Sequence, residues 1–247
     1  MKPRLLFHLP LKQNLQPVVG YAKASVQSDS ESAPIEFWDD GVRAGLYFGP
    51  DSRVDIPMQG NFNPEAGTVM LYFKPDWDAD LDDELGRIVW DLRIDHGSIM
   101  PDDPSQRWAL VYPNPSAVRG GRSEETVARW RFCVETDRNR YVIGTKTKRS
   151  DSRTRQAVWG KQQSFRAGDW LHLAVTWTTT EGAIFVNSRE EGRTVLKEGL
   201  PWRPLPESMQ LGAFSSWMNA GACGIISDFR VYDGALRSAS EGNLRIP

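Results

Sequence analysis

Two carboxylates in the segment ETD, Glu135 and Asp137, are the nearest match in this sequence to the acid pair of a glycosidase. A retaining glycosidase uses two carboxylates about 5 Å apart, one as the nucleophile and one as the general acid. On a strand, such acids recur at alternating positions, but here the string stops, because Arg138, Asn139 and Arg140 follow. We therefore interpret the pair as surface carboxylates that bridge to neighbouring arginines, and we expect no catalysis there.

A second acidic segment, DWDADLDDELGR, resembles a calcium-binding EF-hand loop through Asp76, Asp78 and Asp80. An EF-hand loop also needs glycine at its sixth position and a bidentate glutamate at its twelfth. Leu81 and Arg87 occupy those positions, so the sharp turn and the last ligand are both missing. The segment is predicted to be a solvated acidic loop. The three histidines and two cysteines are scattered along the chain, which argues against a zinc site.

Charge is distributed unevenly along the chain. Residues 75–103 contain ten acids and two arginines, whereas residues 119–166 contain thirteen Lys or Arg and five acids. The basic segment also contains Trp130, Tyr141 and Trp159, and nucleic-acid-binding proteins use such interleaved aromatic and basic residues. The formal net charge of the whole chain is −2, however, so we do not expect nucleic acid to be the partner.

The overall composition is that of an ordinary soluble globular protein, with 40% apolar and 25% charged residues in 247 positions. No apolar run is long enough to span a membrane. The opening segment MKPRLLFHLPLKQ is too short and too polar for a signal peptide. The localisation stays open, because a protein made without export and one whose signal was removed would both fit.

The two cysteines, Cys133 and Cys223, are too few for a disulfide framework. Two free thiols fit a reducing compartment better than an oxidising one, although a bond between the two cysteines stays open at this point.

Hydrophobic residues alternate with a period of two through most of the chain, which predicts strands separated by Gly, Pro, Asn and Asp turns. Strands spaced by about ten residues, with almost no helical pattern, indicate a sandwich or jelly roll. No linker divides the chain, so we expect a single domain over residues 1–247. The predicted strands lie within residues 45–58, 67–76, 86–95, 107–112, 129–137, 140–148, 170–178, 182–188, 208–214 and 224–236.

The segment WLHLAVTW is apolar on both faces, as expected for a central strand that is covered on each side. Its alternation places Trp177 on one face and Trp170 with His172 on the other. We predict that Trp177 lies in the core and that His172 is a structural histidine with its hydrogen bonds satisfied, rather than a catalytic base.

This strand and the next, together FRAGDWLHLAVTW and GAIFVN, resemble the central hairpin of concanavalin A-like, laminin-G-like jelly rolls. Three other segments match the same family in the correct order: GVRAGLYFGPDSRVDIP, GTVMLYFKPDW and LGAFSSWMNAGACGIISDFRVYDGALRSASE. The resemblance covers nearly the whole chain, from about Leu5 to Leu244. It implies an all-β concanavalin A-like (LamG-like) jelly-roll sandwich of two antiparallel sheets, with roughly six or seven strands each.

The chain departs from the family pattern in the hairpin, where Ser188 replaces the glycine that usually follows Asn187. Asp228 matches an acidic position near which some relatives hold a structural calcium ion, so the resemblance allows calcium at this position. The other ligands have no evident match, and no cofactor is expected to be required.

The family includes lectins, adhesion domains, enzymes and particle proteins, so the fold alone does not decide the function. We expect a non-catalytic carbohydrate-binding or adhesion module whose partner is a glycan or polysaccharide. Aromatic side chains in loops are suited to stack on sugars, and Trp159, Trp202 and Trp217 occupy the turn-rich segments AVWGKQ, LPWRPLP and SSWMNAG.

Two alternatives stay open. The same fold could be a structural virion component, such as a phage tail, fibre or capsid-decoration protein, whose oppositely charged segments contact other subunits of the particle. A glycosidase or polysaccharide lyase is the third possibility, and the incomplete carboxylate string argues against it.

Overall fold

The structure is a computed structural model that describes eleven stretches of the chain, namely residues 3–20, 25–28, 36–79, 87–93, 107–112, 130–135, 140–143, 155–158, 165–196, 206–212 and 221–236. These residues form strands and turns and contain no helix. None of the described stretches therefore supplies a helix that could cross a membrane.

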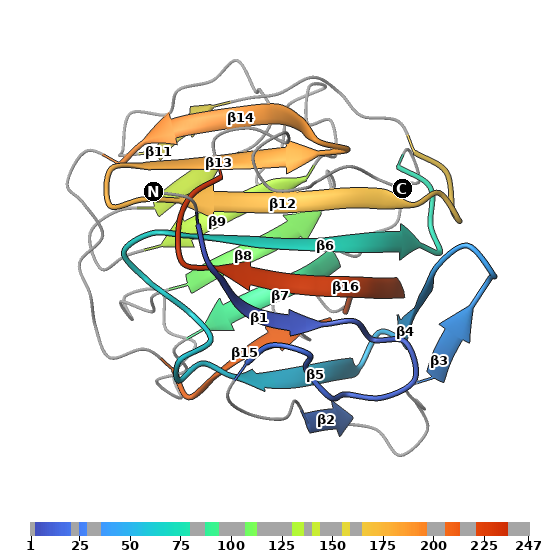
Figure 1. The fold of residues 1–247 in the computed structure, drawn as a ribbon. Coiled ribbons are helices and arrows are strands. Elements are labelled where there is room, and N and C mark those ends of the chain that lie inside the picture. The colour runs from blue at the N-terminus through green and yellow to red at the C-terminus, as the bar shows by residue number, and fades with distance from the viewer. Residues whose placement is uncertain are drawn as a thin grey trace.

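Two eight-stranded sheets make up the described fold (Figure 1). The sheet facing the viewer, which we call the front sheet, has the order β14-β13-β12-β6-β16-β4-β3, and β1 also pairs with β16. The back sheet has the order β11-β10-β9-β8-β7-β15-β5-β2. The front strands are β1 (Leu5–Leu9), β3 (Glu36–Asp39), β4 (Ala44–Phe48), β6 (Gly67–Pro75), β12 (Leu171–Trp177), β13 (Glu181–Val186), β14 (Arg189–Val195) and β16 (Gly224–Tyr232). The back strands are β2 (Ser25–Ser28), β5 (Ser52–Pro57), β7 (Arg87–Arg93), β8 (Arg107–Tyr112), β9 (Arg131–Glu135), β10 (Arg140–Ile143), β11 (Arg155–Val158) and β15 (Ser208–Leu211).

The all-β sandwich predicted from the sequence is confirmed, with two differences in detail. Each sheet has eight strands rather than six or seven. The sequence pattern did not predict five of these strands, namely β1, β2, β3, β11 and β14. Four of these strands have five residues or fewer, and β14 has the charged sequence REEGRTV, so none shows a long apolar alternation. In addition, β10 pairs with β11 in parallel, whereas all the other strand pairs described are antiparallel.

The main apolar core lies between the two sheets. Alternate residues of β6 and β12 point into it, and its largest fully buried side chains are Trp90, Trp130 and Trp177. The indole of Trp177 stacks on the ring of Phe62 with a centroid distance of 5.1 Å. Its Nε1 donates hydrogen bonds to the carbonyl oxygens of Asn63 and Pro64, both at 3.1 Å. The prediction that Trp177 lies on the inner face is thus confirmed.

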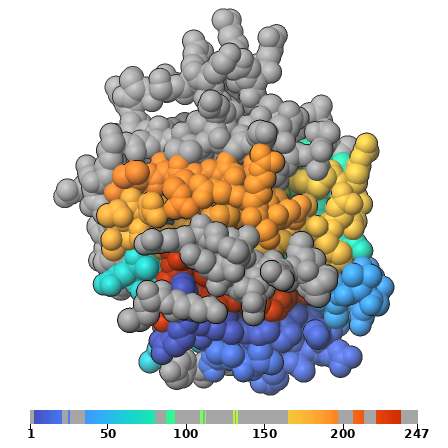
Figure 2. All heavy atoms as spheres, turned by 45° about the horizontal axis from the view of Figure 1, so that its top comes forward, coloured from blue at the N-terminus to red at the C-terminus, as the bar shows by residue number. Residues whose placement is uncertain are grey.

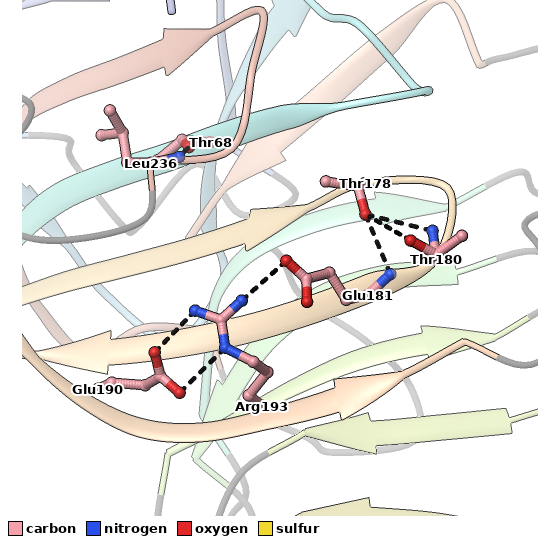
Figure 3. A network of polar contacts seen from close by, with 7 residues as sticks. All are labelled: Thr68, Thr178, Thr180, Glu181, Glu190, Arg193 and Leu236. Carbon is pink, nitrogen blue, oxygen red and sulfur yellow. Dashed lines mark hydrogen bonds and ion pairs between the residues drawn. The ribbon is translucent and has the colours of Figure 1, made fainter.

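The outer face of the front sheet has a smaller apolar cluster, in which Leu236 packs over Met70, Ala174 and Phe185. Thr68 fixes the chain that carries Leu236, as the upper part of Figure 3 shows. Its hydroxyl donates to the carbonyl oxygen of Gly234 at 2.9 Å and accepts the N–H of Leu236 at 3.0 Å. The segment after β16 therefore folds back and covers part of this face.

Edge strand β14 is fastened to the front sheet by Arg193 (Figure 3). The guanidinium donates to Glu190 Oε2 at 2.7 Å and to Glu181 Oε1 at 3.0 Å, so it links β14 to its neighbour β13. At the other end of β13, the two-residue turn of Asn187 and Ser188 has φ values of 48° and 65°. Both values lie in the left-handed region that tight hairpin turns require, so Ser188 adopts the conformation usually taken by glycine there.

Cys223 is a free, buried thiol, so the disulfide between Cys133 and Cys223 that the sequence left open is not formed. Arg87 Nη1 donates a hydrogen bond to Cys223 Sγ at 2.9 Å. Burial raises the pKa of the Cys223 thiol to about 11, which keeps it protonated and unreactive at neutral pH.

Candidate functional site

A tight turn between β3 and β4 positions the first residues of the site. Asp39 Oδ1 accepts the backbone N–H of Gly41 at 2.8 Å, and Asp40 Oδ1 accepts those of Val42 and Arg43 at 2.9 and 2.8 Å. Short acidic side chains commonly stabilise turns in this way, and the φ of 78° at Gly41 is one that glycine adopts at little cost. The turn therefore holds Arg43 in a fixed position.

Five side chains alternate as rings and cations on the outer face of the front sheet, and we call them the aromatic–cation cluster: Trp38, Lys74, Trp170, Arg43 and Tyr72. Lys74 Nζ lies 4.2 Å from the centroid of Trp38 and 5.7 Å from that of Trp170. Arg43 Cζ lies 5.6 Å from the centroid of Trp170 and 3.4 Å from that of Tyr72. Cations at these distances are attracted by the ring faces.

The cluster lies where two distant segments of the chain meet. Figure 2 shows the light-blue β3–β4 hairpin and the yellow segment that leads into β12 at the same side of the molecule. The rings of Trp38 and Trp170, one from each segment, have centroids 6.3 Å apart and are inclined by 57°.

Asp40 connects the polar groups of the cluster. Its Oδ2 accepts hydrogen bonds from Lys74 Nζ at 3.2 Å and from Trp170 Nε1 at 3.4 Å. The backbone N–H groups of Arg43 and Val42, together with Lys74 and Trp170, hold the pKa of Asp40 well below its ordinary value. The carboxylate is therefore ionised at every ordinary pH, and it is paired with Lys74.

The exposure of the cluster suits reversible binding of a small polar ligand. Trp38 and Trp170 are partly exposed, whereas Tyr72 is buried beneath Arg43. The side chains of Lys74 and Asp40 are 19% and 22% exposed to solvent. An indole face can stack on the apolar side of a pyranose, and a fixed ammonium and carboxylate can hydrogen-bond to its hydroxyl groups.

His172 lies beneath this face and differs from the prediction in one respect. It is buried, with 1% exposure, and its ring lies 4.9 Å from that of Tyr72. The prediction of a hydrogen-bonded histidine is wrong, because neither ring nitrogen has a partner within the described stretches. Burial, together with the positive charge of Arg43, lowers the pKa of His172 from 6.5 to about 4. The imidazole is thus neutral at physiological pH.

The three tryptophans predicted to bind glycans, Trp159, Trp202 and Trp217, lie outside the described residues. The structure therefore identifies a different pair of tryptophans, Trp38 and Trp170, as candidates for ligand binding. The three loop tryptophans stay predictions.

The carboxylates of the EF-hand-like segment have structural partners where they are described. Asp76 Oδ2 accepts the hydroxyl of Tyr47 at 3.0 Å, and Asp78 Oδ1 accepts the N–H of Ala167 at 2.7 Å. Burial, followed by the charge of Asp76, raises the pKa of Tyr47 to about 12, and burial raises that of Asp76. Asp80 lies outside the described residues.

Asp228, the position that the family resemblance linked to calcium, is bound by two side chains of the protein. Its Oδ1 lies 2.6 Å from His8 Nε2, and its Oδ2 accepts Arg230 Nη2 at 2.8 Å. Burial acts to raise the pKa of Asp228, but His8 and Arg230 outweigh it and hold the pKa below its ordinary value. In the described part of the chain, no three His, Cys, Asp or Glu residues are grouped closely enough to hold a metal ion.

The other predicted candidates contribute little to a described site. Glu135 lies on β9 with its backbone in register with Arg140 and Arg107, and Asp137 lies outside the described residues. Trp130, one of the aromatic residues of the basic segment, is 2% exposed in the core, so it is not available to a ligand.

Two hollows flank the turn that follows β5, on a different part of the surface. They have volumes of about 800 and 760 Å³ and share Pro57, Gln59 and Gly60 in their walls. The second hollow also includes Pro206, which follows Trp202 by four residues in the sequence. These hollows have no pair of exposed aromatic rings among their described wall residues, so the aromatic–cation cluster is the better candidate.

Sequence reasoning missed most of the cluster because its residues come from separate segments. Trp38 lies on a four-residue edge strand without clear alternation, and Lys74 is a single charged residue in an apolar strand. The segment DDGVR, however, has the composition of a rigid turn and could have indicated that Arg43 is fixed.

Comparisons with known proteins agree with the fold. The family model of the concanavalin A-like lectin/glucanases superfamily matches residues 99–240, which is more than half of the chain. No curated protein sequence matches significantly.

Solved structures similar to this chain include domain 4 of AbnA, an extracellular arabinanase from Geobacillus stearothermophilus, in complex with arabinotriose. It is 16% identical with a TM-score of 0.65, and the match covers 99% of both chains. The binding domain of botulinum neurotoxin DC in complex with SialylT is 12% identical with a TM-score of 0.58, covering 97% of this chain and 50% of that one. Botulinum neurotoxin type C, which interacts with two ganglioside molecules, gives 12% identity and a TM-score of 0.58, covering 98% and 50%. The two-sheet fold and the family match together place this chain in the concanavalin A-like lectin/glucanases superfamily.

Proposed function

We propose that this protein is a non-catalytic carbohydrate-binding module that binds a glycan on the outer face of the front sheet. The observation that carries the proposal is the partly exposed pair Trp38 and Trp170, held beside the fixed charges of Arg43, Lys74 and Asp40. Stacking on the indoles would supply affinity, and the charged groups would orient the sugar hydroxyls.

The relatives support the ligand class and not a particular glycan. AbnA domain 4, which matches this fold over 99% of its chain, is in complex with arabinotriose. Botulinum neurotoxin type C interacts with gangliosides, and the match covers 50% of that chain. At 16% and 12% identity, the likeness is one of fold, and the site in this chain rests on its own residues.

Alanine substitution tests the site directly. Trp38→Ala and Trp170→Ala should each weaken binding to a glycan selected from an array by at least about tenfold, the equivalent of 1.4 kcal/mol. Phe37→Ala is the matched control, because Phe37 is 44% exposed on the same strand but points away from the cluster. Unchanged affinity in both tryptophan variants, measured by calorimetry on folded protein, would refute the cluster as the site.

The loop tryptophans are tested in the same titrations. If Trp159→Ala, Trp202→Ala or Trp217→Ala abolishes binding while Trp38→Ala does not, the protein binds glycans through its loops instead. Such a result would keep the carbohydrate-binding function and move its site.

Two further properties belong to the proposal. Among the described residues, Asp40 is the one carboxylate hydrogen-bonded to side chains of the aromatic–cation cluster, whereas glycoside hydrolysis uses two, so the purified protein should release no reducing ends from polysaccharides. Release that disappears in Glu135→Gln would instead show a glycosidase. Binding should also persist in EDTA, because no cofactor contributes to the proposed contacts.

A further inference from the structure

Arg43 differs from the other cation of the cluster in its partners. Lys74 is paired with the carboxylate of Asp40 at 3.2 Å. The guanidinium of Arg43 instead lies over the ring of Tyr72, and among the residues that the structure describes it has no carboxylate and no hydrogen-bond acceptor. Its N–H donors are therefore left for solvent or for a ligand.

The nearby groups that could neutralise Arg43 are engaged elsewhere or carry no charge. Asp40 accepts hydrogen bonds from Lys74 and Trp170, and Asp228 is hydrogen-bonded to His8 and Arg230. His172, which lies behind Tyr72, is held neutral by burial and by the charge of Arg43 itself.

The arginine is also held rigidly before any ligand arrives. Its backbone N–H is fixed by Asp40 at 2.8 Å, and one face of its guanidinium rests on Tyr72, which is only 7% exposed. A guanidinium presents paired N–H donors in a plane that matches the two oxygens of a carboxylate. Little side-chain freedom is lost on binding, so such a pair would contribute to affinity.

We infer that Arg43 gives the proposed glycan site a preference for acidic sugars, with a sugar carboxylate held by the guanidinium while the sugar ring stacks on Trp170. The 5.6 Å between Arg43 Cζ and the Trp170 centroid suits a sugar acid that carries its carboxylate directly on the ring. This inference rests on the proposed function.

Matched ligand pairs test it. Trigalacturonate and its methyl ester, and 3′-sialyllactose and its methyl ester, differ mainly in whether the sugar carboxylate is free and charged. For the pair that binds, the acidic member should bind at least about tenfold more tightly at low salt, as expected for hydrogen bonds to a charged group. Arg43→Gln should remove that difference, and Arg43→Lys should restore only part of it, because an ammonium lacks the planar fork.

The control is Arg189→Gln, which removes the same charge from a side chain 60% exposed on edge strand β14. It should leave the preference unchanged. Equal binding of acidic and neutral members, or a preference that survives Arg43→Gln, would overturn the inference while leaving glycan binding intact. Failure of every acidic and neutral glycan on an array to bind would overturn the proposed function, and this inference with it.

Discussion

His172 makes the stability of this protein sensitive to mild acid, because its imidazole is buried in the neutral form. In the unfolded chain the ring takes up a proton near its ordinary pKa of 6.5, whereas in the native state it does so only near pH 4. Its contribution to stability is therefore fully present above about pH 6.5 and is lost as the pH falls toward about 4. The nearby charged groups Arg43 and Arg230 oppose protonation, and Asp228 favours it.

The size of the effect follows from the two pKa values. A shift of one pKa unit corresponds to about 1.36 kcal/mol. Protonation of His172 in the unfolded chain therefore lowers the free energy of unfolding, relative to neutral pH, by about 2 kcal/mol at pH 5 and about 3 kcal/mol at pH 4. A loss of this size is a substantial part of the stability of an ordinary domain.

The assay is urea unfolding at several pH values between about 7.5 and 4. His172→Phe keeps a ring beside Tyr72 but cannot be protonated, so its free energy of unfolding should fall about 2 kcal/mol less than that of the wild type between pH 7.5 and 5. Thr176→Val is the matched control, since Thr176 is buried on the same face of β12 and does not titrate. It should retain the pH dependence of the wild type.

Parallel loss of stability in the wild type and in His172→Phe would refute the reasoning. An NMR titration of the histidine side chains provides an independent check, because a native pKa of His172 near 6.5 would mean that the ring is hydrated or paired.

Two further predictions concern the core and the assembly state. Trp177→Ala should lower the free energy of unfolding by about 3–5 kcal/mol in denaturant titrations, since it empties the space between Phe62 and Trp90, whereas Trp38→Ala at the surface should cost much less. The protein should sediment as a monomer at low and at high salt. Assembly that dissociates in about 1 M salt, where the screening length is near 3 Å, would favour a structural particle component instead.

Strand alternation was sufficient to predict the sandwich and the direction of its central side chains. Strand β12, buried at all seven positions, was predicted as a doubly covered strand, and Trp177 was placed on its inner face. The edge strands were missed, because β3 and β14 are short or charged and obtain much of their stability from their neighbours.

The candidate site was less predictable for a different reason. Its contacts join Trp38, Lys74 and Trp170 from three segments, and the pairing of a cation with a ring leaves no periodic signal in a sequence. The same limit applies to His172. Its burial could be predicted from the strand pattern, but the lack of a hydrogen-bond partner depends on the side chains that the fold places around it.

The position of β16 has a consequence for the synthesis of the protein. In the described front sheet, strand pairing joins β6 and its neighbours to β4 and β3 only through β16, and β1 also pairs with β16. Residues 224–232 leave the ribosome after all the other described strands, so a nascent chain carries two unpaired sheet edges until then. Completion of this sheet is thus a late event, and a ribosome that stalls before Gly224 would leave a chain prone to aggregation and in need of chaperones.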